Sequence, residues 1–158
     1  MHYTGTIWRP PYEAYSLLIQ VTAGCTHHSC KFCTLYEDLP FKFRMSPLTE
    51  VEEDLGEASR FYKKVPRIFF TGANPFALSV DKLKTLAKMV KQYYSTYETI
   101  GCFGRITDVS NKTVDDLKEL RQFGYDGITF GIETGDDEAL AFMNKGYQSQ
   151  DIIEQCKK

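Results

Sequence analysis

Residues 21–33 read Val-Thr-Ala-Gly-Cys-Thr-His-His-Ser-Cys-Lys-Phe-Cys and place Cys25, Cys30 and Cys33 in a C-x4-C-x2-C spacing. The apolar run at residues 15–21 directly before them predicts a buried strand. The three thiols therefore follow a strand on a loop, close enough together to bind one metal centre. Three thiolates leave a fourth coordination position open, and a centre with an open position is more often reactive than structural.

The cysteine spacing leaves other interpretations open. The thiols could bind structural zinc, with His27 or His28 completing a Cys3His site, and such a protein would be colourless. They could be unligated core residues, although their clustering beside His and Lys disfavours this. Plant-type ferredoxins share the spacing but need a fourth cysteine, and the next one, Cys102, lies far downstream.

Composition limits the class of protein. The chain has 158 residues, of which 42% are hydrophobic, enough for one domain with a core. The net charge is −2 and no block of like charges occurs, so no nucleic-acid or membrane surface is indicated. No run is long enough to span a membrane, and the start lacks a signal-peptide pattern. Five cysteines, three of them clustered, favour a metal in the reducing cytoplasm over disulfides.

Hydrophobic periodicity predicts strands and helices in alternation. Residues 1–14 form an N-terminal arm whose two prolines, Pro10 and Pro11, predict an extended or turn conformation without helix. Residues 15–158 form the domain, with strands at 15–21, 66–71, 98–103 and 126–132 and helices at 47–64, 80–93, 114–123, 136–145 and 149–158. Gly24 ends the first strand, and residues 34–44 form an aromatic loop.

Helix boundaries are predicted from capping residues. Ser46 is the expected N-cap of the first helix, Ser79 that of the second, and Thr113 with Asp116 forms a capping box. Gly146 ends the helix at 136–145.

Strand–helix alternation predicts an α/β fold with a parallel sheet and right-handed crossovers. In such a sheet the carboxyl ends of the strands meet at one edge, where ligands bind. The segments at this edge are the cysteine loop, Gly72-Ala73-Asn74, Gly104-Arg105 and Glu133-Thr134-Gly135. The sequence therefore predicts a site at this edge, built around the three cysteines.

These motifs resemble the radical S-adenosylmethionine (SAM) superfamily. Gly131-Ile-Glu-Thr-Gly-Asp-Asp resembles the fourth-strand segment of the branch containing coproporphyrinogen dehydrogenase-like, Elongator-like and methylthiotransferase enzymes. The resemblance implies a partial (β/α) TIM-like barrel in which Cys25, Cys30 and Cys33 hold a [4Fe-4S] cluster whose unique iron binds SAM. It also implies reductive cleavage of SAM to a 5′-deoxyadenosyl radical that abstracts hydrogen from a substrate.

The resemblance further implies which residues contact SAM. Phe32 occupies the position of an aromatic residue beside the adenine, and Gly72, Ala73 and Asn74 match the second-strand motif that holds the methionine amino group. The residues expected to face the SAM ribose or carboxylate are Glu133 and Lys145, with Arg105 as a third. An electron donor such as a flavodoxin or ferredoxin is implied as a partner, and the substrate is unknown.

The chain departs from the family pattern in three ways. It has one extra residue between Cys25 and Cys30, and it has Asn74 where an acidic residue is common. It also ends after four βα units of about six, so we expect a truncated core with an unpaired edge at 126–132, prone to aggregate or dimerise. An inactive truncated homologue is therefore an alternative function. Cys102 and Cys156 are expected to be small core residues. His27 and His28 are expected either to contact the ligating residues from behind or to face solvent.

Overall fold

The computed structural model describes residues 1–158 and contains a four-stranded parallel sheet in the order β1-β4-β5-β6. These strands are β1 (Leu17–Gln20), β4 (Arg67–Thr71), β5 (Thr99–Gly104) and β6 (Tyr125–Phe130). The predicted α/β fold, a partial TIM-like barrel of parallel strands, is confirmed. β1 and β6 are the two edges of the sheet, so the fourth predicted strand does have an unpaired outer edge.

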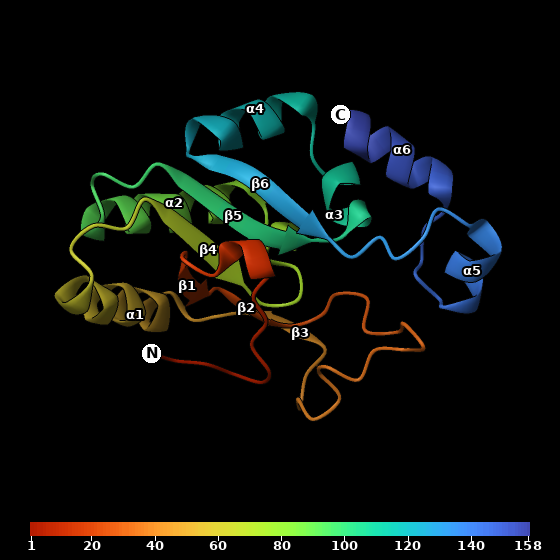
Figure 1. Ribbon diagram of the computed structural model, residues 1–158, viewed down its shortest axis with the longest axis horizontal. Coiled ribbons are helices and arrows are strands. Elements are labelled where there is room, and N and C mark those ends of the chain that lie inside the picture. The colour runs from red at the N-terminus through yellow and green to blue at the C-terminus, as the bar shows by residue number, and fades with distance from the viewer.

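Three helices follow the strands and cover one side of the sheet (Figure 1). They are α1 (Leu48–Phe61), α2 (Val80–Tyr93) and α4 (Val114–Gln122). Apolar residues of these helices and of the strands are buried together in one core, among them Ile19, Leu55, Ile68, Phe70, Leu83, Leu86, Val90, Ile100 and Leu120. Cys102 lies fully buried in this core, as predicted.

A small hairpin that the sequence did not predict supports the cysteine loop. After Val21 the chain continues as β2 (Thr22–Gly24), which pairs antiparallel with β3 (Phe43–Met45). Gly24 was expected to end a strand, but it is the last residue of this second one. Its φ is +76°, and a Cβ there would lie 2.2 Å from the carbonyl oxygen of Lys42. The hairpin therefore brings the two ends of the loop at residues 25–42 together and requires glycine at its base.

The hairpin also corrects the start of the first helix. The backbone N–H of Ser46 donates to the carbonyl of Val21 (2.9 Å), so Ser46 extends the hairpin and does not cap α1. Pro47 is the N-cap residue, without a side-chain hydrogen bond. The predicted caps at Ser79 and Thr113 are confirmed, since each side chain accepts a backbone N–H three residues later.

The C-terminal third differs from prediction in its helix ends. A short helix, α3 (Ile106–Ser110), was not predicted, and α5 (Asp137–Phe142) ends three residues earlier than expected. Asn144 and Gly146 follow with φ of +56° and +77°, and these left-handed residues terminate the helix. The last helix, α6 (Ser149–Lys157), buries none of its residues, so the prediction that Cys156 belongs to the core was wrong.

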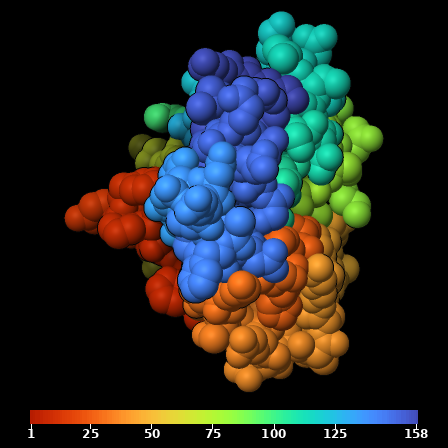
Figure 2. All heavy atoms as spheres, turned by 90° about the vertical axis from the view of Figure 1, so that its right-hand side faces the viewer, coloured from red at the N-terminus to blue at the C-terminus, as the bar shows by residue number.

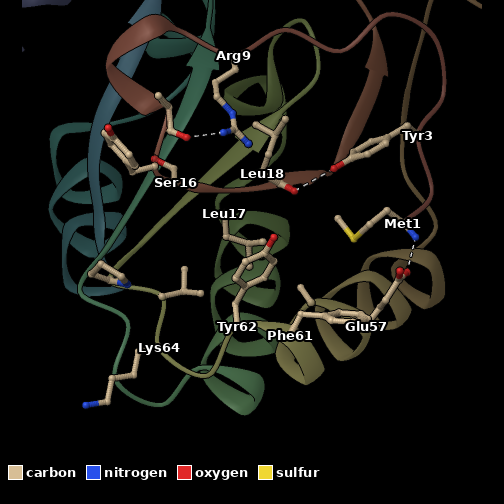
Figure 3. Close-up of a pocket in the computed structure, with 15 residues that line it drawn as sticks. Met1, Tyr3, Arg9, Ser16, Leu17, Leu18, Glu57, Phe61, Tyr62 and Lys64 are labelled. Carbon is tan, nitrogen blue, oxygen red and sulfur yellow. Dashed lines mark hydrogen bonds and ion pairs between the residues drawn. The ribbon is translucent and has the colours of Figure 1, made fainter.

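The N-terminal arm is anchored beside the edge strand β1. The Tyr3 hydroxyl donates to the carbonyl of Leu18 (3.3 Å), and the Arg9 guanidinium donates to that of Ala14 (2.7 Å) (Figure 3). A cavity of about 630 Å³ lies between the arm, β1 and the end of α1, and neither cysteine nor histidine lines it. The arm contains a short 3₁₀ helix, η1 (Pro11–Glu13), where no helix was predicted, because proline is tolerated at a first helical position.

No helix of the chain is both long and apolar enough to cross a membrane.

We expect Gly24→Ala to destabilise the protein by about 1–3 kcal/mol or more, because a non-glycine residue would adopt a left-handed conformation and meet the Lys42 carbonyl. Urea unfolding of the apo protein measures this. Gly135→Ala is the control, since its Cβ would meet nothing within 4 Å. Equal stability of the two variants would contradict the role given to Gly24.

Candidate metal centre

A cavity of about 530 Å³ opens at the carboxyl edge of the parallel sheet. Nine of the ten predicted site residues line it: Cys25, Cys30, Phe32, Cys33, Gly72, Ala73, Arg105, Glu133 and Lys145. Residues from four separate strand ends therefore meet around one space. The exception is Asn74, which is fully buried beside it.

The three clustered cysteines are free thiols that remain partly exposed. Burial raises the pKa of the Cys30 thiol, while the nearby cations of Lys145 and Arg105 act to lower it. These cations are well placed to offset the charge that three ligating thiolates would carry.

The arrangement of the thiols bears on which group could bind. No three His, Cys, Asp or Glu side chains converge closely enough to hold a single metal ion. In a [4Fe-4S] cluster each cysteine binds its own iron, so three ligands lie farther apart than around one ion. Three free thiols around one cavity, with cations beside them, fit the three-cysteine ligand set of a cluster.

Neither histidine of the cysteine loop is placed as a zinc ligand, since neither lines the cavity. The His27 ring Nε2 lies 2.6 Å from the carbonyl oxygen of Asn144, to which it donates a hydrogen bond. Burial lowers the pKa of His27, which agrees with a neutral ring holding its proton on that nitrogen. His27 is therefore engaged with the turn after α5 and not with the thiols.

Asn74 holds the cysteine loop from one side. Its Oδ1 accepts the backbone N–H of Thr26 (3.2 Å), the residue after Cys25, and its Nδ2 donates to the Thr26 hydroxyl (2.7 Å). The same Nδ2 donates to the Asp108 carboxylate (3.0 Å), which also accepts the backbone N–H of Arg105 (2.7 Å). This chain of hydrogen bonds joins three strand-end loops. Asparagine suits the position because it both donates and accepts, whereas an aspartate would face Asp108 with a like charge.

The turn after α5 holds the loop from the other side. The Lys31 backbone N–H donates to the carbonyl of Met143 (3.0 Å), and the Asn144 side chain donates to the carbonyl of Ser29 (2.7 Å). Neither this contact nor the one made by Asn74 was predicted from the sequence. The available signal was Asn144 and Gly146 two residues apart, which marks a left-handed helix end.

Glu133 and Lys145 form the charged wall of the cavity. Lys145 Nζ donates to the carbonyl of Gly131 (2.7 Å) and lies 3.3 Å from Glu133 Oε1. The ammonium is also 5.5 Å from the centre of the Phe32 ring. Lys145 is almost buried, whereas Glu133 is 40% exposed and has φ of +69°. One Glu133 oxygen thus pairs with Lys145 while the side chain remains open to a ligand.

Comparison with known proteins identifies the family. The sequence pattern of the radical SAM superfamily matches residues 19–158. Over 86 residues the chain is 25% identical to the heme chaperone HemW of Bacillus subtilis (strain 168). The matched segment covers 54% of this chain and 23% of HemW. The solved structure of the cobalamin-dependent S-adenosylmethionine radical enzyme OxsB with aqua-cobalamin bound matches with a TM-score of 0.67 and 19% identity, over 88% of this chain and 21% of that one.

The radical SAM enzyme coproporphyrinogen III oxidase (HemN) from Escherichia coli also shares the fold. It matches with a TM-score of 0.64 and 16% identity, over 89% of this chain and 32% of that one. The chain thus spans about a quarter of the curated relative's length and a third or less of either structure's. The sequence match to HemW agrees with the coproporphyrinogen dehydrogenase-like branch predicted from the fourth-strand segment, and HemN shares the fold. With the family pattern covering all four βα units, the chain belongs to the radical SAM superfamily.

Proposed function

We propose that this chain binds a [4Fe-4S] cluster through Cys25, Cys30 and Cys33 and holds SAM against it for reductive cleavage. The observation that carries the proposal is the single cavity lined by three free thiols and by the glycine-rich ends of the neighbouring strands. When bound, the cluster supplies the electron that breaks the sulfonium C–S bond of SAM and yields a 5′-deoxyadenosyl radical. A flavodoxin or ferredoxin is the class of partner that would provide this electron.

The protein's part in this reaction is binding and orientation. Gly72, with φ of +127°, brings bare backbone to the cavity wall, and a Cβ there would lie 2.1 Å from the Thr22 hydroxyl oxygen. Backbone N–H and C=O groups near such a turn can approach the amino and carboxylate groups of SAM without side-chain interference. Phe32 is 53% exposed and offers its ring to the adenine.

Charge in the cavity is suited to the zwitterionic amino-acid end of SAM. Lys145 and Arg105 place cations near the thiols, and the open face of Glu133 adds an acceptor. In this proposal Glu133 accepts a hydrogen bond from a ribose hydroxyl or from the amino group. Asn74 takes a different part from the one its motif implied, because its amide is already used in fixing the loop through Thr26.

The cluster is tested by replacing each ligand with alanine. We expect Cys25→Ala, Cys30→Ala and Cys33→Ala each to lose most bound iron and the absorption near about 400 nm after anaerobic reconstitution, because the cluster loses one of its three protein ligands. Cys156→Ala is the control, since this cysteine is exposed on α6. A triple alanine variant that still bound four irons, or a colourless zinc-loaded native protein, would refute the assignment.

The SAM site is tested at Glu133. Glu133→Ala should weaken SAM binding to the reconstituted protein by about 1–3 kcal/mol, the value of a hydrogen bond to a charged or buried polar partner. Equilibrium binding and the SAM-induced change in the cluster's EPR signal measure the effect. Glu138→Ala is the matched control, because Glu138 is exposed on α5 and does not line the cavity. Unchanged affinity in Glu133→Ala would return this residue to a structural role.

The loop-fixing role of Asn74 is tested by Asn74→Asp, which places a second carboxylate beside buried Asp108. We expect a loss of about 1–3 kcal/mol in the free energy of unfolding of the apo protein at pH 7. The folded pKa of the carboxylate pair would be raised, so the loss should shrink as the pH falls and one proton is taken up. Unfolding curves from pH 4 to 8 measure it.

Asn111→Asp makes the same chemical change at an exposed position and should cost little at any pH. A pH-independent loss in Asn74→Asp would show that charge repulsion is not its cause.

A further inference from the structure

The N-terminal arm forms one wall of the cavity that holds the cysteines. Trp8, Arg9, Pro10, Pro11 and Tyr12 all line this cavity. Figure 2 shows the arm, in red, on one side of the molecule and the yellow-green segment around the start of α2 on the other. The arm therefore does more than lead into β1, since it crosses the open face of the sheet next to the proposed cluster.

Hydrogen bonds hold the arm along β4, and the arm and the strand run antiparallel. The Thr71 hydroxyl, at the carboxyl end of β4, donates to the carbonyl of Trp8 (2.9 Å). At the amino end, Arg67 donates to both carboxylate oxygens of buried Glu13 (2.7–2.9 Å). Between these anchors the Tyr12 hydroxyl bonds to that of Thr129 in β6. The arm is a fixed wall, stiffened further by two adjacent prolines.

The side chains that this wall presents are aromatic and open. Trp8 is 51% and Tyr12 70% exposed, although Trp8 is held to the sheet through its backbone carbonyl and Tyr12 through its hydroxyl. The Arg9 guanidinium donates to the carbonyl of Ala14, so the one arginine of the arm is directed to the arm's own backbone. The arm wall thus differs from the charged wall of Glu133, Lys145 and Arg105. Rigid, exposed aromatic rings inside a cavity gain free energy when an apolar or planar ligand covers them.

We propose that Trp8 and Tyr12 form the substrate-binding wall and that the substrate is a planar aromatic or heteroaromatic molecule that stacks on their rings. This proposal rests on the proposed function, because SAM occupies the charged side of the same cavity. Substrate specificity is then determined partly by the segment that precedes the first strand.

Binding of a planar probe to the anaerobically reconstituted protein tests the proposal. Equilibrium dialysis compares 2-naphthol with decahydro-2-naphthol, its saturated and non-planar counterpart. We expect 2-naphthol to bind at least tenfold more tightly, with saturating SAM leaving its affinity unchanged. Trp8→Ala and Tyr12→Ala should each weaken 2-naphthol binding about tenfold, equivalent to about 1.4 kcal/mol. Tyr12→Phe keeps the ring and should stay within about twofold of the native protein.

Tyr15→Ala is the matched control, because Tyr15 is fully exposed and lines the cavity beside α1 instead. Iron content and SAM binding, measured in the same samples, should be native in every variant. Equal binding of the two probes, no effect of either alanine variant, or competition between 2-naphthol and SAM would each overturn the proposal. If the native protein takes up no iron, the proposed function fails on its own, and dialysis of the iron-free protein still decides the role of the aromatic wall.

Discussion

The hydrogen bonds of the Asn74 amide are the interaction on which the arrangement of the site depends. Residues 25–42 contain no helix or strand of their own, so the cysteine loop takes its shape from its neighbours. Asn74 joins Thr26 in that loop to Asp108 behind β5, and the amide is fully buried. Leaving one of these buried polar groups without a hydrogen bond would cost folding free energy, so the loss of any partner would destabilise the whole network. The cysteines are thereby positioned relative to β4 and β5 before any ligand binds.

The turn after α5 completes this support from the fourth βα unit. Asn144 and Met143 contact the loop at Ser29 and Lys31, the two neighbours of Cys30, through backbone groups, so that thiol stays free to face the cavity. Lys145 extends from the same turn to the carbonyl of Gly131 and to Glu133. One short segment therefore connects the proposed cluster ligands to the proposed SAM contacts. A change in this turn would alter both, although it touches no thiol directly.

The parallel sheet was predictable because short segments rich in apolar residues alternate along the chain with segments of helical periodicity. The topology placed the cysteine loop, Gly72-Ala73, Arg105 and Glu133 at one edge, since parallel strands bring their carboxyl ends together. Lys145 follows a helix and was predicted only from the family resemblance. The direction of a side chain at a turn cannot be predicted from the topology. This is why the sequence did not reveal that Asn74 points to Thr26 and not into the cavity. The hairpin was not predicted because strands of three residues are too short to show an alternating hydrophobic pattern. The two prolines predicted an extended arm but carried no information about the face it covers.

Arg67 explains why the arm lies where it does. At the amino end of the sheet its guanidinium contacts Asp126 as well as Glu13, so two strands and the arm share one cation. Burial alone would raise the pKa of Glu13, but the hydrogen bonds from Arg67 and Ser16 lower it, so the carboxylate stays charged near neutral pH. The ion pair is remote from the thiols, at the opposite end of β4, yet it fixes the direction in which the arm crosses the sheet. Stability at the amino end and the shape of the cavity at the carboxyl end are therefore linked through residues 8–13.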